Sequence, residues 1–267
     1  MKNIFFVTRA DDAASSKSAN IAIAKTIKRS FIKNVSIMAP GEHLDHAADL
    51  FSKKREVCFG MHGTLNAEWD KVKWKPVSAM PDGNGLTDEN GYFHNDPEVF
   101  LKTKPQPELV IKEYAAQLDK LTKAGFKIAY VDSHMFPEMC IPGMDEAVCD
   151  FAKQKGLLDH MYYYVLPPGF LEAANNGNLT KVLKNIPDGQ YFYVAHPAKY
   201  SEEMLKTGNS RVSGNEIAKN RSSEAKFLSS VFINSGARLM GIQPLRYDEA
   251  KPLDKRLTVE DVRKLLG

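Results

Sequence analysis

The sequence predicts an α/β protein built around a parallel sheet, and three observations support this. Short apolar runs rich in β-branched and aromatic residues alternate with longer amphipathic stretches about seven times along the 267 residues. The first run, Ile4 to Val7, is apolar without alternation, which is typical of a strand covered on both faces. Several runs end in Asp or His. Because seven or eight β–α units suit a barrel better than an open sheet, we expect a TIM-like (β/α) barrel that is distorted or seven-stranded.

Length and composition suit a single domain over residues 1–267. The chain is 43% hydrophobic and 26% charged, which supplies a large core. Its net charge is only +3 and its Lys and Arg residues are dispersed, so no nucleic-acid partner is expected. The three cysteines form no CxxC pair, which argues against a disulfide framework and a thiolate zinc site. With no secretory leader and no apolar stretch of ~20 residues, we expect a cytoplasmic protein without a membrane partner.

The N-terminal part alternates strand and helix. The strand at residues 4–7 runs directly into Asp11 and Asp12, and either carboxylate could cap the following helix or take part in chemistry. The next strand but one ends in His62. The elements expected here, in chain order, are a helix at 21–31, a strand at 35–38, a helix at 43–54 and a strand at 56–61.

Residues 63–107 form a long loop insertion after the third strand. The segment is rich in Pro and Gly and leaves room only for a short helix near residues 97–101. Irregular segments of this length in compact domains are usually functional loops or lids. Its aromatic residues, Trp69 and Trp74 among them, suit the apolar faces of sugar rings. Anchoring the loop to the body of the protein is the more common use of any single one.

The C-terminal half continues the alternation. Pro107 opens a helix that Gly125 closes, and the strand at 126–131 ends in Asp132 and His134. The remaining expected elements are a helix at 144–155, a strand at 161–166, a short helix at 179–185, a strand at 190–195 ended by His196, a long helix at 215–235 stopped by Gly236, a strand at 237–241 and a terminal helix at 259–266.

Reactive side chains gather at the C-terminal ends of the expected strands, which lie on one face of a parallel α/β fold. These residues are Asp11, Asp12, His62, Asp132, His134 and His196. Such a set is hard to assign to packing, and carboxylate with neutral imidazole is a ligand set for Mg²⁺, Mn²⁺ or Zn²⁺. The other histidines, His43, His46, His94 and His160, fall in helix or loop stretches and are expected to be solvated.

The residue types indicate how such an ion would be used. One carboxylate and two imidazoles would hold it and leave positions for water and substrate. The ion would lower the pKa of bound water and polarise a carbonyl, and a spare carboxylate could act as general base. The adjacent Asp11 and Asp12 divide naturally into one ligand and one base. No compact HExxH-type signature is present, so the fold must bring the ligands together.

Five segments occur in an order that matches one known family over nearly the whole chain. They are Arg9-Ala10-Asp11-Asp12, which resembles NADD(F)G; residues 60–66, which resemble G-[LMV]-H-x-x-L-[TN]; residues 86–93, which resemble L-x-D-x-x-G-x-F; Asp132-Ser133-His134, which resembles DSH; and residues 194–197, which resemble [VC]-x-H-P. Arg221 and Glu224 resemble a late R-x-x-E. Each motif is weak alone, and together they resemble the YdjC-like carbohydrate deacetylases, the chitooligosaccharide deacetylase family.

The resemblance implies a TIM-barrel-like fold, often dimeric, that binds a divalent metal, usually Mg²⁺. It implies hydrolysis of the acetyl group from an N-acetylated amino sugar, its oligosaccharide or its phosphate. The implied metal ligands are Asp12, His62 and His134. The resemblance gives Asp11 the role of general base and His196 that of general acid or oxyanion partner, while Asp132 would orient an imidazole. Zn²⁺ and Mn²⁺ stay open because Asp-His-His accepts several metals.

The chain departs from the family pattern in three places. Arg9 replaces the usual Asn, and it could balance the acidic pair or contact a substrate phosphate. Ala13-Ala14 replace Phe-Gly, and residues 135–138 stand where many members continue DSH with two further histidines. The departures bear on the substrate, for which Trp69 is a further candidate contact.

Two alternatives stay open. One is a non-catalytic or diverged carbohydrate-binding protein, which the missing histidines favour. The other is a different metal-dependent sugar-phosphate enzyme on the same barrel, although no Gly-rich phosphate loop is found.

Overall fold

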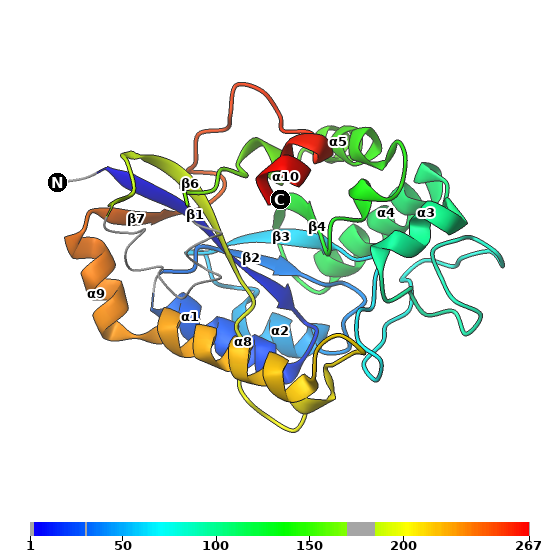
Figure 1. Cartoon of the computed structure of the whole chain (residues 1–267), viewed down its shortest axis with the longest axis horizontal. Helices are drawn as coiled ribbons and strands as arrows, with labels where there is room; N and C mark the ends of the chain where they lie inside the picture. Colours follow the sequence, from blue (N-terminus) through cyan, green and yellow to red (C-terminus); the bar gives the residue numbers. More distant parts are fainter. Residues whose placement is uncertain (1–2, 30, 170–184, 267) are drawn as a thin grey trace.

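A curled parallel sheet runs through the centre of the computed structural model, which describes residues 3–29, 31–169 and 185–266 (Figure 1). Its strands are β1 (Ile4–Ala13), β2 (Asn34–Ile37), β3 (Cys58–Gly63), β4 (Ile128–Ser133), β5 (Leu158–Asp159), β6 (Gly189–Ala195) and β7 (Ile242–Leu245). The order is β5-β4-β3-β2-β1-β6, β7 also pairs with β1, and all pairs are parallel. The expected α/β class and the distorted, seven-stranded barrel are confirmed. In the described part of the chain, no pairing joins β5 to β6, so the sheet curls without closing.

The long strand β1 organises the sheet because it pairs with three others. Its first half pairs with β7, its second half pairs with β2, and β6 accompanies it from Ile4 to Ala10. The register with β2 shifts between Ala10 and Ala13, and inside this irregularity Asp12 has a φ of 60°. Asp tolerates this left-handed conformation better than most residues. The bulge therefore redirects the side chains of the acidic pair at the C-terminal end of the strand.

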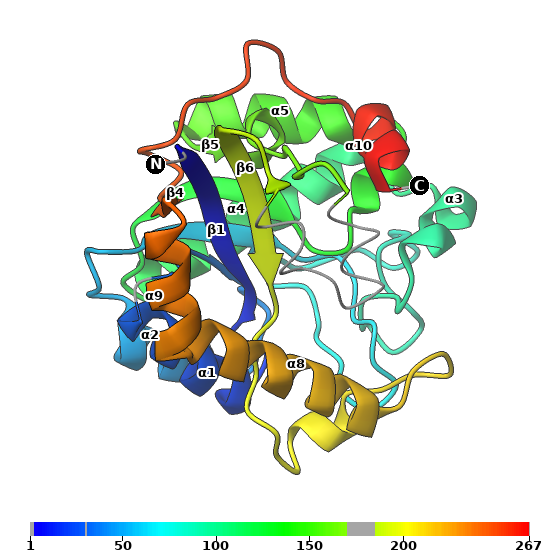
Figure 2. The ribbon, with the colours of Figure 1, turned by 60° about the vertical axis from the view of Figure 1, so that its left-hand side comes forward.

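Helices cover the sheet on two sides, as Figures 1 and 2 show. The α-helices are α1 (Lys17–Lys28), α2 (Leu44–Phe51), α3 (Phe100–Thr103), α4 (Pro107–Lys123), α5 (Met144–Lys155), α8 (Gly214–Ser229), α9 (Val231–Leu239) and α10 (Val259–Leu266). Short 3-10 helices are η1 (Pro97–Val99), η2 (Pro137–Met139), η3 (His160–Tyr162) and η4 (Met204–Lys206). Helix α1 contacts both α2 and α8 on one side, and α4 packs on α5 on the other. Within the described ranges, no helix combines the length and apolarity needed to cross a membrane.

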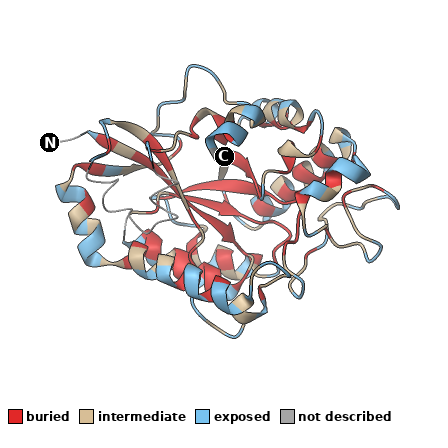
Figure 3. Ribbon diagram, in the orientation of Figure 1, coloured by how far each residue is buried: buried red, intermediate tan, exposed pale blue. Residues whose placement is uncertain are grey.

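The central strands β1, β2 and β3 are buried between these layers, whereas β6 and β7 are only partly buried (Figure 3). Both Ile4 and Val7 are fully buried, as the continuous apolar run at the start of β1 predicts. On one side of the sheet, the rings of Phe51, Phe59 and Phe126 pack with centroids 5.2 to 6.1 Å apart. These contacts join α2 to the start of β3 and to Phe126, which precedes β4, so they stabilise the N-terminal ends of these two strands.

The loop insertion at 63–107 is anchored to the body by buried polar contacts. The indole nitrogen of Trp74 donates to the carbonyl of Asn66 at 2.6 Å. The buried carboxylate of Glu113 on α4 accepts the backbone N–H groups of Val77 and Ser78, each at 2.8 Å. For Trp74 the anchoring interpretation is therefore confirmed, because its ring is buried.

The strand expected at 161–166 is wrong. The fifth strand is the two-residue β5, and the next residues form η3. The carboxylate of Asp159 accepts the N–H of Met161 at 2.9 Å, and this cap starts the 3-10 turn where periodicity had suggested a strand. The apolar character that suggested a strand reflects burial, because Tyr163 and Tyr164 pack in the core.

The region around Gly236 also differs from expectation. The helix expected at 215–235 is broken into α8 and α9 by Ser230, which is extended and whose hydroxyl accepts the N–H of Ile233 at 3.4 Å. Gly236 lies inside α9 instead of ending a helix, and the last strand begins at Ile242, so the strand expected at 237–241 is wrong. A serine cap outweighs continuous helical spacing here. The short helix expected at 179–185 lies almost entirely outside the described residues.

Candidate metal centre

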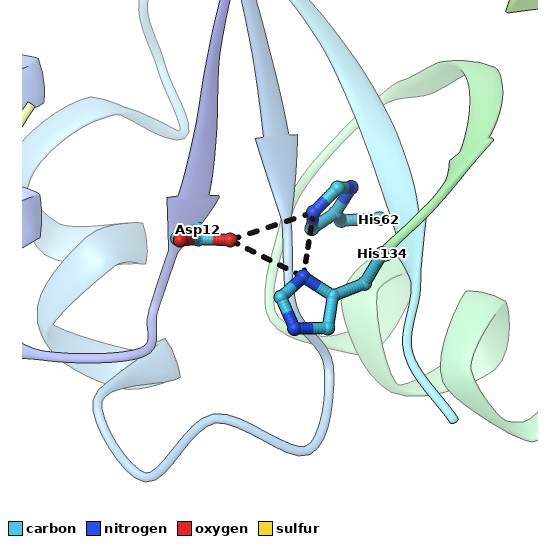
Figure 4. Close-up of side chains that lie close together, drawn as sticks. All are labelled: Asp12, His62 and His134. Carbon is cyan, nitrogen blue, oxygen red and sulfur yellow. Dashed lines mark hydrogen bonds and ion pairs between the residues drawn. The ribbon is translucent and has the colours of Figure 1, made fainter. Parts of the chain in front are cut away.

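Three neighbouring segments bring Asp12, His62 and His134 together, as Figure 4 shows. Asp12 comes from the bulge of β1, His62 from β3, and His134 from the turn that follows β4. The Oδ1 atom of Asp12 lies 3.5 Å from Nε2 of His62 and 3.4 Å from Nδ1 of His134. The two imidazole nitrogens are 3.2 Å apart. Three side chains that are far apart in sequence thus present one ligand atom each to a common point.

These atoms fit a divalent cation. Asp12 Oδ1 is buried and, among the described residues, it faces the two imidazole nitrogens without forming a hydrogen bond, so a cation placed between these three atoms would be favourable. The three separations of 3.2 to 3.5 Å suit atoms that each lie about 2.0–2.2 Å from one ion. One carboxylate oxygen and two imidazole nitrogens also match the donor preferences of several divalent metals. The cluster could therefore hold a metal ion.

Each imidazole is oriented by a carboxylate on its other nitrogen. Asp132 Oδ2 lies 3.1 Å from Nδ1 of His62, and Glu68 Oε2 lies 2.9 Å from Nε2 of His134. A carboxylate at the distal nitrogen fixes the N–H there and leaves the lone pair of the near nitrogen for a cation. Asp132 therefore lies where an orienting group was expected. No motif pointed to Glu68, which lies in the loop insertion and reaches the site only through the fold.

The two imidazoles carry raised pKa values. Burial opposes the charged form of His62, but Asp132 and Asp11 outweigh it and raise the pKa to about 10. Burial likewise opposes the charge on His134, and Glu68 and Asp12 raise its pKa to about 9. Near neutral pH both rings are therefore doubly protonated and positively charged. A metal ion would have to displace the proton on the nitrogen that faces Asp12.

Arg221 on α8 binds the far oxygen of the Asp12 carboxylate. Its Nη1 lies 2.6 Å from Oδ2, so the two oxygens of Asp12 have different neighbours. Burial opposes ionisation of Asp12, but Arg221, His134 and His62 together hold its pKa well below the ordinary value. Arg221 belongs to the R-x-x-E motif but was not predicted as a site residue, because its proximity to Asp12 depends on how α8 packs.

Asp11 lies beside the cluster and is engaged by Arg9. The guanidinium donates from Nε to Oδ1 at 2.6 Å and from Nη2 to Oδ2 at 2.7 Å. Arg9 is only 3% exposed, so the structure favours the interpretation in which it balances the acidic pair over contact with a substrate phosphate. Asp11 can also form a second group of possible ligand atoms, with His62 and Asp132.

A cavity of about 590 Å³ opens beside the cluster, within the size range of small-molecule sites. Its wall combines the carboxylates of Asp12 and Glu68 with the aromatic rings of Trp69, Trp74 and Tyr92. Trp69 also packs under Arg221, whose guanidinium carbon lies 5.8 Å from the ring centroid. The aromatic and carboxylate groups thus face the same space.

His196 follows β6, as predicted, and borders a neighbouring groove of about 370 Å³ with Trp69 and Arg221. Its backbone N–H donates to Glu224 Oε2 at 2.6 Å, which fixes the turn after the strand. Through this contact Glu224 of the R-x-x-E motif positions the His196 segment at this groove.

The remaining histidines are not all solvated. His43 borders the cavity and pairs with Glu203 at 3.0 Å. His160 is 3% exposed and packs against the rings of Phe136 and Tyr164, so the expectation of a solvated side chain is wrong. Burial and the nearby Arg9 lower its pKa to about 4, and it stays neutral.

The sequence is similar to that of a known protein family and to several named proteins. Residues 6–165, which include Asp12, His62 and His134, match the family described as YdjC-like protein. The chain is 23% identical over 220 residues to a carbohydrate deacetylase of Thermoanaerobacter pseudethanolicus, covering 75% of this chain and 84% of the relative. It is 28% identical over 152 residues to a chitooligosaccharide deacetylase of Klebsiella pneumoniae, covering 57% and 56% of the two chains.

The fold has a solved counterpart. A structure from Enterococcus faecalis V583, of a candidate cellobiose-phosphate cleavage protein, superposes with a TM-score of 0.69. The superposition covers 92% of this chain and 98% of the other at 18% identity. At that identity the likeness bears on the fold alone.

Proposed function

The chain belongs to the YdjC-like protein family, and from this premise we propose that it is a metal-dependent carbohydrate deacetylase. Its reaction would be hydrolysis of the acetyl group from an N-acetylated amino sugar, its oligosaccharide or its phosphate. Relatives named carbohydrate and chitooligosaccharide deacetylase support the substrate class.

One observation carries the proposal: Asp12, His62 and His134 converge beside a cavity with aromatic walls. A divalent ion held by these three residues would polarise the amide carbonyl and lower the pKa of water. The family resemblance favours Mg²⁺, and the donor set also suits Zn²⁺ or Mn²⁺. The rings of Trp69 and Tyr92 offer flat apolar surfaces on which a sugar could stack.

In the proposed reaction, the oxygen of water attacks the acetyl carbon and a carboxylate accepts its proton. The C–N bond then breaks, the amine nitrogen takes a proton, and acetate and the free amino sugar leave. We propose Asp11 as the base, held in place by Arg9, and His196 as the acid for the amine. Asp11 does not line the cavity whereas Glu68 does, so Glu68 is the competing base.

The experiment is acetate release from N-acetylglucosamine, its short oligosaccharides and its phosphate, after chelation and after return of Mg²⁺, Mn²⁺ or Zn²⁺. We expect release that depends on the ion and that falls at least 100-fold in Asp11→Asn. Asp119→Asn, an exposed acid paired with Lys123 far from the cluster, is the matched control.

The outcomes separate the assignments. Turnover that survives chelation would refute the metal-dependent mechanism. Full activity in Asp11→Asn together with loss in Glu68→Gln would transfer the role of base to Glu68. The homodimer and the cytoplasmic location expected from the sequence stay predictions.

A further inference from the structure

Arg9 is a buried cation that contacts several side chains in addition to the carboxylate of Asp11. Besides its two bonds to Asp11, its Nη1 lies 2.8 Å from Oδ2 of Asp132 and 3.3 Å from the hydroxyl of Tyr247. Its guanidinium carbon lies 4.9 Å from the ring centroid of Phe192. The contacts come from β1, β4, β6 and the segment after β7, so the position of the guanidinium is fixed from several sides.

Two partners of Arg9, Asp11 and Asp132, could bind a metal together with His62. Asp11, His62 and Asp132 offer ligand atoms that all lie within 4.8 Å of one another. Asp132 is fully buried, and its Oδ1 has no hydrogen-bond partner in the described part of the chain. A buried carboxylate with an unpaired oxygen indicates a place where a cation is favourable. The guanidinium already supplies a positive charge there.

We propose that Arg9 is a positioning residue whose guanidinium stands in for a second metal ion between Asp11 and Asp132, and so limits the centre to one ion. The role of Arg9 in orienting the base rests on the proposed function, whereas the number of ions bound does not.

Charge and shape both support this role. Two buried carboxylates without a cation would repel each other and lose solvation. A guanidinium is always charged, and its planar fork matches the two oxygens of Asp11. Burial opposes the charge on Arg9, but Asp11 and Asp132 raise its pKa well above the ordinary value. It therefore remains a cation throughout the pH range in which the protein could work.

The chain also contains a matched control. Arg256 bridges two aspartates in the same way, with Nη2 2.6 Å from Asp145 and Nε 2.5 Å from Asp159. The candidate ligand groups found in the described residues include none of these three side chains. Arg256→Met therefore removes a comparable cation and its ion pairs without freeing a group of side chains that could bind a metal.

The experiment counts Mn²⁺ ions bound per full-length chain, by equilibrium dialysis and by electron paramagnetic resonance. We expect one ion in the wild type, in Arg9→Lys and in Arg256→Met, and two in Arg9→Met, with a signal from coupled ions. Arg9→Gln, which keeps a hydrogen-bond donor and loses the charge, is the second variant if Arg9→Met does not fold, and it should also bind two.

Each possible result of this experiment either supports or overturns the proposal. A second ion in the wild type, or a single ion in a folded Arg9→Met or Arg9→Gln variant, would overturn the proposal. A wild type that binds no ion would refute both the metal centre and this inference. A wild type that binds one ion but releases no acetate would refute only the proposed substrate reaction, and the Arg9 variants would still test the ion count.

Discussion

The contact between Glu68 and His134 allows a quantitative test. A buried hydrogen bond to a charged group contributes about 1.5–3 kcal/mol, which corresponds to ~10- to 150-fold in a binding constant. In Glu68→Gln the new amide oxygen could still accept the Nε2–H of His134, so this substitution should lie at the lower end. For metal binding to the deprotonated site we expect a loss of about tenfold.

The proton on His134 makes this loss dependent on pH. With a pKa of about 9, His134 must release a proton near neutral pH before it can bind an ion, which weakens apparent binding by ~100-fold at pH 7. Glu68 is the largest contribution that raises this pKa against the effect of burial. Removing its charge lowers the pKa, so the tenfold loss should be masked at pH 7 and should emerge toward pH 9.

Calorimetric titration with Mn²⁺ in buffers of different ionisation enthalpy gives the number of protons released. We expect about two near pH 7.5 for the wild type, from His62 and His134, and about one for Glu68→Gln. Glu203→Gln is the matched control, because Glu203 pairs with His43 at the same cavity and should leave the count at two. Equal proton release by the wild type and Glu68→Gln would refute the reasoning.

Three further predictions concern stability, measured by urea unfolding. Gly63→Ala places a methyl group 2.3 Å from the buried ring of Tyr114, so we expect a loss of about 1–3 kcal/mol, and a stable variant would show that the ring can move. Trp74→Phe removes the bond to Asn66 and should cost about 1–3 kcal/mol, since a buried carbonyl loses its donor. Burial raises the pKa of Glu138 to about 7, so the folded state binds its proton more tightly than the unfolded state does. The protonated Glu138 side chain therefore stabilises the folded state. This contribution to the free energy of unfolding is fully present below about pH 4.5 and is lost as pH rises through 7. Glu138→Gln should therefore stabilise the protein by up to about 3 kcal/mol at pH 8 and little at pH 4, and an effect independent of pH would contradict the assignment.

The sequence was most informative where periodicity and strand ends coincide. The apolar run at Ile4 to Val7 is largely buried as predicted, and the C-terminal ends of β1 and β3 and the turn after β4 provide Asp12, His62 and His134. This succeeded because parallel strands place their C-terminal ends at one edge of the sheet, whatever the details of packing. The family motifs identified the same residues and supplied the proposed chemistry.

Only the tertiary structure decided what surrounds those ligands. Glu68 reaches His134 and Arg221 reaches Asp12 because a loop and a helix fold over the strand ends, and no local pattern encodes such contacts. The sequence shows Arg9 next to the acidic pair, but the fold also brings Asp132 against it. Local side-chain caps at Asp159 and Ser230 likewise outweighed the apolar spacing that suggested a longer strand and a longer helix. The sequence alone thus determined which groups meet at the sheet edge, whereas long-range packing determined how each one is charged and oriented, because both depend on burial and on partners distant along the chain.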